Sequence, residues 1–333
     1  MIGYIIRRVL LMIPTLFVIS VITFIIIQLP PGDYLTTYIA NLQETGEEAD
    51  EALVESLRVR YGLDKPLYEQ YFIWMRGMLL RGDLGQSFSM NNKPVTELIG
   101  ERVALTVVVT FFAIVFTWIV AIPIGIYSAT HQYKVSDYFI SVLGFIGMAT
   151  PEFSLALLVM YFSSEMFGVS VGGLFSDAYI DAPWSWARVG DLLVHIWVPV
   201  VILGVAGTAG MIRTMRANLL DQLEMPYVVT ARAKGVSETR LLVKYPVRVA
   251  INPMISTIGW MLPALFSGSA IVAMVLGLPM IGPLLLRALM EQDMYLAGSL
   301  VMIMSVLTVI GTLISDILLA WVDPRIRLER QRS

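Results

Sequence analysis

The chain has 333 residues, of which 57% are hydrophobic and only 15% are charged. An average soluble domain carries about 25% charged residues, so this composition indicates a membrane protein. The chain contains no cysteine, which excludes disulfides and thiolate metal sites, and its net charge of −3 gives no indication of nucleic-acid binding.

Six apolar runs are long enough to cross a bilayer core, which needs about 20 mostly apolar residues. No small-residue cleavage site follows the first run, so we expect a retained span rather than a signal peptide. The third run is too long for one straight helix and contains Pro151, where we expect a break or kink. The runs span approximately residues 9–27, 103–127, 138–167, 192–212, 254–276 and 295–322.

The distribution of basic residues predicts the orientation, because Lys and Arg concentrate on the cytoplasmic side of membrane proteins. With the N-terminus inside, the two short outer loops contain only Arg188 and Arg287 among basic residues. We therefore predict an all-α membrane protein with six transmembrane helices and both termini cytoplasmic. The expected parts are a tail and first helix (1–28), an extracytoplasmic segment between helices 1 and 2 (29–102), a five-helix core (103–322) and a cytoplasmic tail (323–333).

The extracytoplasmic segment carries an acidic run at 44–55 and helical patterns at 49–60 and 67–80, separated by a turn at 62–66. It is either a solvated cap over the helix ends or a docking or gating surface for an extracytoplasmic partner. The sequence alone leaves both interpretations open.

Residues that could carry enzymatic chemistry are missing from the sequence. There is no phosphate-binding loop of the Gly-x-x-x-x-Gly-Lys-Ser/Thr type, and the two histidines, His131 and His195, lie near the ends of different runs. We expect a transport subunit that has no catalytic or metal site, does not hydrolyse ATP itself and is driven by a partner. The alternative is a stand-alone secondary transporter driven by an ion gradient, which needs ionisable residues near the bilayer midplane.

Glu152 is the charged residue that best fits such a position, because it follows Pro151 near the middle of the third run. Intramembrane charges are costly and often functional, so Glu152 is a candidate pathway residue, together with Trp260 in the fifth run. The alternative for Glu152 is a structural role, in which it hydrogen-bonds backbone groups freed by the break.

A basic, amphipathic stretch at 224–253 lies between the fourth and fifth runs, within a predicted cytoplasmic loop at 213–250. It has more structure than a connector needs, so we expect a soluble partner to dock on it. The small residues Ala231, Ala233 and Gly235 would let a short helix sit deep in a groove, and Gly235 is expected to end that helix. Arg232 and Lys234 would then reach the rim of the groove.

The motif TARAKG at 230–235, preceded by Glu224 and Tyr227, resembles the cytoplasmic signature loop of permeases in binding-protein-dependent ABC importers. More narrowly, the chain resembles the dipeptide/oligopeptide/nickel permease family. The resemblance covers essentially the whole chain in order. Its other motifs are YIIRRVLLMIPTLFVIS at 4–20, YGLDKPLYEQY at 61–71, RGDLGQSFS at 81–89, TPEF at 150–153 and DPRIR at 323–327.

This resemblance implies the fold of a type I ABC importer permease in a bacterial or archaeal cytoplasmic membrane. It implies four partners: a second homologous permease subunit, two ATPase subunits that bind ATP and Mg, and an extracytoplasmic substrate-binding protein. The chain itself would hold no cofactor and would form half of the translocation pathway. The residues implied to contact the ATPase are Tyr227, Thr230, Ala231, Arg232, Ala233, Lys234 and Gly235.

The substrate stays open between peptides and oligosaccharides, with nickel also within the family. Ala273 stands where many peptide permeases carry an acidic residue, and Met280 where they carry glycine. The extended segment at 171–193 resembles oligosaccharide-carrying members. Trp184, Trp186 and Trp197 are either sugar-stacking residues or interfacial anchors.

Overall fold

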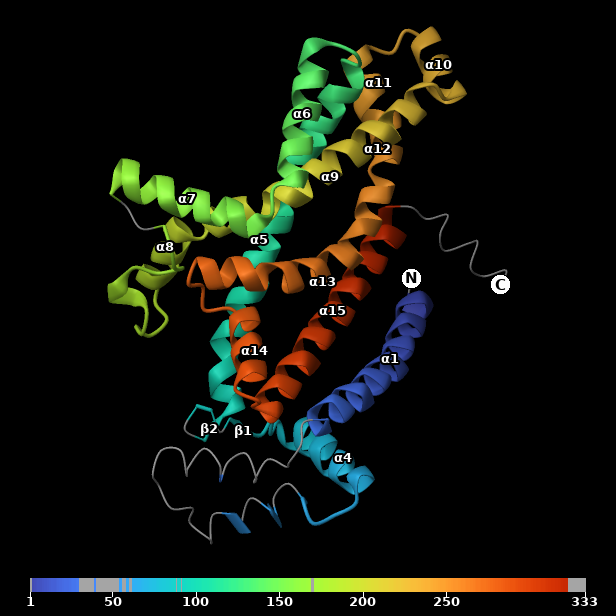
Figure 1. Ribbon diagram of the computed structural model, residues 1–333. Coiled ribbons are helices and arrows are strands. Elements are labelled where there is room, and N and C mark those ends of the chain that lie inside the picture. Colours follow the sequence, from blue (N-terminus) through green and yellow to red (C-terminus); the bar gives the residue numbers. More distant parts are fainter. Residues whose placement is uncertain are drawn as a thin grey trace. The chain divides into compact units, whose positions relative to one another are not determined.

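The computed structural model describes residues 2–29, 39, 54–55, 58–59, 62–87, 89–90, 92–168 and 171–322, with the backbone alone at 2, 4, 258–269, 294 and 321–322. Most of the described residues are helical, and the strands form one short hairpin (Figure 1). The chain divides into two compact units. The first comprises Met1–Ile5, Leu105–Met280 and Ile310–Ser333, and the second comprises Ile6–Ala104 and Ile281–Val309.

The first unit is built on α9, a long helix that packs against α6, α7, α12 and α13. Small residues allow α9 to approach α5 closely: a Cβ atom placed on Gly125 of α5 would lie 2.7 Å from Cβ of Met215 on α9. The helices of this unit are α6 (Val135–Ala149), α7 (Glu152–Phe167), η2 (Asp177–Tyr179), α8 (Trp186–His195), α9 (Trp197–Leu223), α10 (Pro226–Ala233), α11 (Glu238–Lys244), α12 (Pro246–Ala250) and α13 (Asn252–Val275), with most of α5 (Val95–Thr130) and the end of α15 (Met294–Val322).

The expected break at Pro151 is confirmed, since α6 ends at Ala149, α7 begins at Glu152, and the two helices are bent by 99°. Proline has no backbone N–H and cannot continue the hydrogen-bond ladder of α6. Thr150 ends α6, with its N–H and its hydroxyl both donating to the Ile146 carbonyl, at 3.0 and 2.8 Å. The third apolar run is therefore a bent pair of helices, as Figure 1 shows.

The second unit contains α1 (Ile2–Gln28), α4 (Leu67–Arg76), a π-helix η1 (Gly77–Arg81), the strands β1 (Gln86–Ser87) and β2 (Lys93–Pro94), α14 (Ile281–Met290) and the first turns of α5 and α15. The strands pair antiparallel, with Gln86 opposite Pro94. The helical pattern predicted at 67–80 is thus confirmed as α4 followed by η1. One apolar cluster joins α1, α4 and α15 through Phe24, Trp74 and Tyr295.

Four helices are long and apolar enough to cross a membrane within the described ranges: α1, α5, α9 and α15; the α6–α7 pair would be a fifth. The fifth expected run coincides with α13, which includes the backbone-only residues 258–269. The six-span count and the sidedness of both termini and of the outer segment stay predictions. The tail at 323–333, with its DPRIR motif, and most of the acidic run at 44–55 lie outside the described residues.

Candidate functional site

The candidate coupling helix is α10, which lies with α11 beyond the end of α9 (Figure 1). Pro226 occupies its first turn, where the missing N–H costs nothing. Gly235 adopts a left-handed conformation with φ +77°, and its N–H donates to the Arg232 carbonyl at 3.0 Å. The next N–H, of Val236, donates to the Ala231 carbonyl at 3.3 Å. This pair of bonds is a Schellman motif, so the prediction that Gly235 ends the helix is confirmed.

One side of α10 packs inside the loop itself. Val228, Ala231 and Leu241 form a small buried cluster, against which Val236 and Tyr245 pack. The expectation that Ala231 lets α10 sit in a partner's groove is therefore not supported, because its methyl group faces α11. The sequence could not reveal this, since Ala fits both a buried helix contact and an exposed one.

The other side of α10 is exposed and presents Tyr227, Thr230, Ala233 and Lys234. The Tyr227 hydroxyl donates to Oε1 of Gln222 at 2.8 Å, and partial burial raises the pKa of this phenol. The Thr230 hydroxyl donates back to the Pro226 carbonyl at 2.8 Å. This face offers small and polar contacts and one cation.

The sequence predicts that Arg232 reaches the rim of a groove on a partner. In the structure, its guanidinium instead bonds within the loop. Its Nε and one terminal nitrogen donate to the two carboxylate oxygens of Glu238, at 2.7 and 3.2 Å. The hydrogen bond from Arg232 lowers the pKa of the Glu238 carboxyl. The pair bridges α10 to α11, whereas Lys234 has no such partner among the described residues.

A second site, which the sequence did not predict, lies on the helix that carries the loop. Arg216 of α9 donates from Nε to Oδ1 of Asp137 at 3.0 Å and from a terminal nitrogen to Oδ2 at 2.8 Å. Asp137 of α6 also accepts from the Ser128 hydroxyl of α5 and from the Tyr133 N–H at 3.1 Å. Three helices therefore meet at one buried carboxylate. The sequence identified Arg216 only as a basic residue of the inner side.

A comparable cluster in the second unit explains the RGDLGQSFS motif. Asp293, which is fully buried, accepts from the Ser87 hydroxyl at 2.5 Å and from the hydroxyl and N–H of Ser89 at 2.9 and 3.2 Å. Its other oxygen accepts from the Leu296 N–H at 3.2 Å in the first turn of α15. The serines of the motif thus attach the hairpin to the α14–α15 connection.

The two candidate pathway residues, Glu152 and Trp260, lie in different helices, α7 and α13. Glu152 is half-buried at the first position of α7, and no described side chain donates to its carboxylate. Trp260 lies in α13 where only the backbone is described. Within the described ranges, His, Asp and Glu form no group of three that could hold a metal ion.

The three tryptophans considered for sugar stacking differ in their surroundings. Arg188 lies between two rings, with its guanidinium carbon 4.5 Å from the Phe175 centroid and 4.6 Å from the Trp184 centroid. One face of Trp184 is therefore occupied by the protein. Trp186 and Trp197 are exposed, at 91% and 58%.

Comparison with known proteins decides between the functions that the sequence left open. Residues 121–328 match the family of binding-protein-dependent transport system inner membrane components, and residues 1–110 match the N-terminal region of such components. The chain belongs to this family. It is therefore a permease subunit of a membrane transport system and not an enzyme. The importer interpretation is confirmed, and nothing supports the stand-alone ion-driven carrier.

Curated relatives match over nearly their whole lengths. The chain is 35% identical over 327 residues to the oligopeptide transport system permease protein AppB of Bacillus subtilis, covering 98% of this chain and 99% of that protein. It is 30% identical to the dipeptide transport system permease protein DppB of Lactococcus lactis, over 98% and 100%. It is 31% identical to the glutathione transport system permease protein GsiC of Escherichia coli K12, over 98% and 99%.

Proposed function

We propose that this permease forms half of a translocation pathway for small peptides in an ATP-driven importer. The relatives are named for oligopeptides, dipeptides and glutathione, which are all peptides or peptide-like. The proposed assembly contains a second homologous permease, two cytoplasmic ATPases that bind ATP and Mg, and a substrate-binding protein outside the cytoplasmic membrane. The names of the relatives are the observation that supports peptides as the substrate class. Binding measurements on the cognate substrate-binding protein test it, and a protein that binds oligosaccharides and not peptides would contradict it.

The two departures from the peptide-permease pattern do not weigh against peptides. Ala273 and Met280 are each 1% exposed and belong to the apolar core of the first unit. Their side chains pack against other apolar residues and offer no polar group to a substrate. We interpret both substitutions as changes in core packing.

The topology follows from this assignment as a proposal: six transmembrane helices, both termini cytoplasmic and residues 29–102 outside. Single cysteines can test it, because the natural chain has none. With a membrane-impermeant thiol reagent on intact cells, Asp181→Cys should be labelled and Lys244→Cys should not. Strong labelling at position 244 would reverse the orientation. Arg216 is unsuitable for such a probe because it pairs with the buried Asp137.

For energy coupling, we propose that the exposed face of α10, with Tyr227, Thr230, Ala233 and Lys234, contacts an ATPase subunit. The supporting observation is the local architecture: α10 has a capped end and its own small core with α11. A rigid element of this kind passes on a displacement where a flexible loop would absorb it. Because α10 and α12 contact α9, the movement would reach the membrane helices directly. Ala231, Arg232 and Gly235 would support this face from within the loop.

The decisive experiment compares Gly235→Val with Gly235→Asn in the reconstituted importer. A Cβ at this position meets no atom within 4 Å, so neither side chain is blocked. Asn tolerates the left-handed conformation, whereas a β-branched residue costs about 1–2 kcal/mol there. We expect normal membrane insertion for both, and loss of co-purified ATPase or of substrate-stimulated ATP hydrolysis for Gly235→Val alone. Normal association and turnover in Gly235→Val would contradict the coupling role.

For the pathway, we propose that Glu152 lines the route of the substrate. Glu152→Gln keeps the size of the side chain and removes its charge, so assembly should be normal while the transport rate changes. A structural role predicts instead that Glu152→Ala lowers the yield of complex and leaves transport per complex unchanged. Transport measured per assembled complex in proteoliposomes separates the two outcomes.

A further inference from the structure

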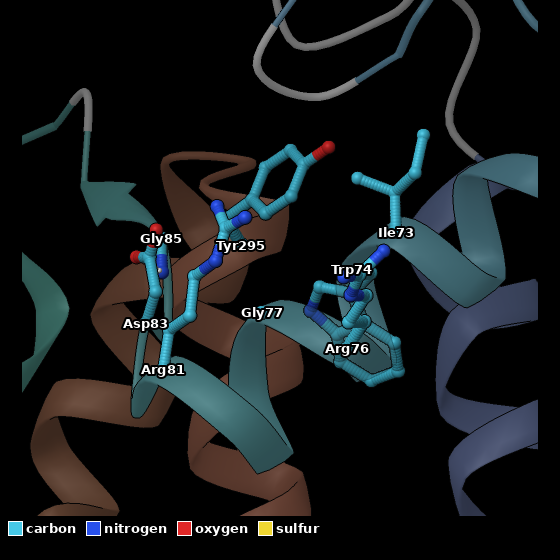
Figure 2. A pocket seen from close by; sticks show the side chains of 8 residues that line it. All are labelled: Ile73, Trp74, Arg76, Gly77, Arg81, Asp83, Gly85 and Tyr295. Carbon is cyan, nitrogen blue, oxygen red and sulfur yellow. Dashed lines mark hydrogen bonds between the residues drawn. The ribbon is translucent and has the colours of Figure 1, made fainter.

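A pocket of about 190 Å³ lies between α4, η1 and the start of α15, all within the second unit (Figure 2). Arg81, Asp83 and Tyr295 lie on one side, Trp74 and Arg76 lie on the other, and Gly77 lies between them. The proposed transport function uses none of these residues.

The π-helix η1 gives the pocket its form. Arg76 immediately precedes this helix and Arg81 is its last residue, and the chain then turns through Gly82 with φ +63°. The turn is closed by the Asp83 N–H, which donates to the Gly77 carbonyl at 3.0 Å. Single π-turns are rare and occur often at functional sites. Here the two ends of the wide turn, Arg76 and Arg81, both line the pocket.

The charged residues that line the pocket are two arginines and one aspartate, so the pocket carries a net positive charge. Asp83 is the acid in its wall, and Oδ1 of that residue accepts from the Gly85 N–H at 3.0 Å within the turn. Arg76 and Arg81 are both exposed. Neither arginine forms an ion pair or a side-chain hydrogen bond with another described residue. The indole N–H of Trp74 is buried without an acceptor among the described residues. Because buried donors almost always have an acceptor, this N–H is suited to donate to an oxygen atom of a ligand in the pocket.

Contacts with α1 place α4, which lines this pocket, against a candidate membrane span. The Tyr71 hydroxyl and the Ser20 hydroxyl are 2.7 Å apart, and the Phe24 ring lies 5.5 Å from Tyr71 and 5.9 Å from Trp74. Ser20 and Phe24 belong to the candidate span Ile5–Gln28. At 1.5 Å per residue, Ser20 lies about 12 Å before the end of that span, so α4 packs against its apolar part.

The elements that line the pocket, and α1 against which α4 packs, also carry exposed apolar side chains. Phe72, Leu79 and Leu80 are 64%, 73% and 75% exposed, and Ile25 and Ile22 of α1 are also exposed. An apolar helix face beside arginines is typical of an element that lies in a membrane interface. A water-soluble anion would leave this apolar surface uncovered, whereas a phospholipid would cover it with its acyl chains.

We propose that the pocket binds the phosphate group of an anionic phospholipid. Arg76 and Arg81 donate to the phosphate oxygens, because the planar guanidinium matches phosphate geometry. The acyl chains lie along Phe72, Leu79 and Leu80 toward α1. The site occupies the outer leaflet if residues 29–102 are outside as proposed, but the binding itself does not depend on the sidedness or on the transported substrate.

The test measures lipid retained by the intact complex of permease and partner chains, using native mass spectrometry with added phosphatidylglycerol or phosphatidylcholine. The double variant Arg76→Gln/Arg81→Gln should bind phosphatidylglycerol about tenfold or more weakly, since each basic residue near an anionic headgroup contributes about 1 kcal/mol. The control is Arg58→Gln, which removes a basic residue of the same segment that pairs with Glu55 and does not line the pocket. It should bind like the natural chain.

Three results would overturn the proposal. The first is equal retention of phosphatidylglycerol by the double variant and the control. The second is displacement of the lipid by millimolar inorganic phosphate, which would make the pocket a site for the free ion. The third is unchanged lipid binding with lost association of the substrate-binding protein, which would assign the arginines to a protein partner. All three substituted arginines are exposed, so we expect each variant to fold. An unchanged elution volume of the complex in size-exclusion chromatography checks this.

Discussion

Two buried aspartates, one in each unit, show two different ways of keeping a carboxylate out of water. Asp137 is 3% exposed and is neutralised by Arg216, with two hydrogen bonds from the guanidinium. Asp293 is 0% exposed, and its carboxylate accepts from two serine hydroxyls and two backbone N–H groups. Both join segments far apart in the sequence, but only the first joins them through a charge pair.

The difference decides how each site responds to change. A charge pair depends on its cation, because a single buried charge is far more costly than the pair. A carboxylate held by neutral donors depends on pH instead: burial raises the pKa of Asp293, and the hydrogen bonds from Ser87, Leu296 and Ser89 offset this in part. The first site should therefore be sensitive to mutation and the second to both mutation and pH.

The largest effect is expected from Arg216→Met, which leaves Asp137 buried without a cation. Removing one member of a buried pair costs about 3–5 kcal/mol, and the partial exposure of Arg216 places the loss near the lower end. The double variant Asp137→Asn/Arg216→Met removes both charges and should regain most of the stability. Denaturation of the purified complex measures this cycle. Additive losses in the double variant would mean that the pair does not act as a unit.

The next effect is expected from Ser87→Ala, which removes the 2.5 Å hydrogen bond to Asp293. Leaving a buried acceptor with fewer donors costs about 1–3 kcal/mol. The matched control is Ser305→Ala, whose hydroxyl donates only to the Val301 carbonyl one turn earlier, at 2.8 Å. That variant should be nearly neutral. Equal losses in both variants would show that Asp293 gains nothing specific from the serine.

The pH dependence of Asp293 should be weaker but has a defined sign. Its folded-state pKa is raised, so the folded state binds the proton more tightly than the unfolded state. Stability from this group is present below the unfolded pKa, about 3.9, and is lost as pH rises through the raised folded-state pKa. The difference in melting temperature between the natural chain and Asp293→Asn should change over that window. A constant difference would contradict the raised pKa.

The smallest effect is expected from Arg232→Gln, although its bonds to Glu238 are as short as those of Arg216 to Asp137. Both members of this pair are exposed, so water and salt screen the interaction. The pKa of Glu238 is lowered, but we expect no measurable change in the melting temperature relative to Lys234→Gln as control. A clear loss in Arg232→Gln alone would show that the bridge between α10 and α11 is a structural requirement.

Local chemistry in the sequence predicted local structure well. Pro151 marked a true break because proline cannot donate in a helix, and Gly235 marked a helix end because it reaches positive φ without strain. The helix predicted at 67–80 is likewise bounded by a proline and a glycine: it begins after Pro66 and ends before Gly82. Its last turn is a π-helix. Family motifs added the function, since they occur in order along the whole chain.

Contacts between distant residues could not be predicted in this way. Arg216 and Asp137 are 79 residues apart, and Asp293 is 206 residues from Ser87. Nothing in a single sequence specifies which acid a given Arg will meet. The small size of Ala231 also did not define its surroundings, because alanine fits a contact inside the loop as well as a contact with a partner. The angle of the bend at Pro151, 99°, could not be predicted either, since proline predicts a break without fixing its angle.

The bend at Pro151 changes the electrostatic environment of the Glu152 carboxylate. In the linear sequence this acid lies in the middle of an apolar run, where a charge is costly. In the structure it occupies the first turn of α7, and the N–H groups of Ser154 and Leu155 turn back to the Pro151 carbonyl, at 3.0 and 3.1 Å. The start of a helix carries the equivalent of about half a positive charge. The broken helix therefore supplies its own counter-charge to the acid.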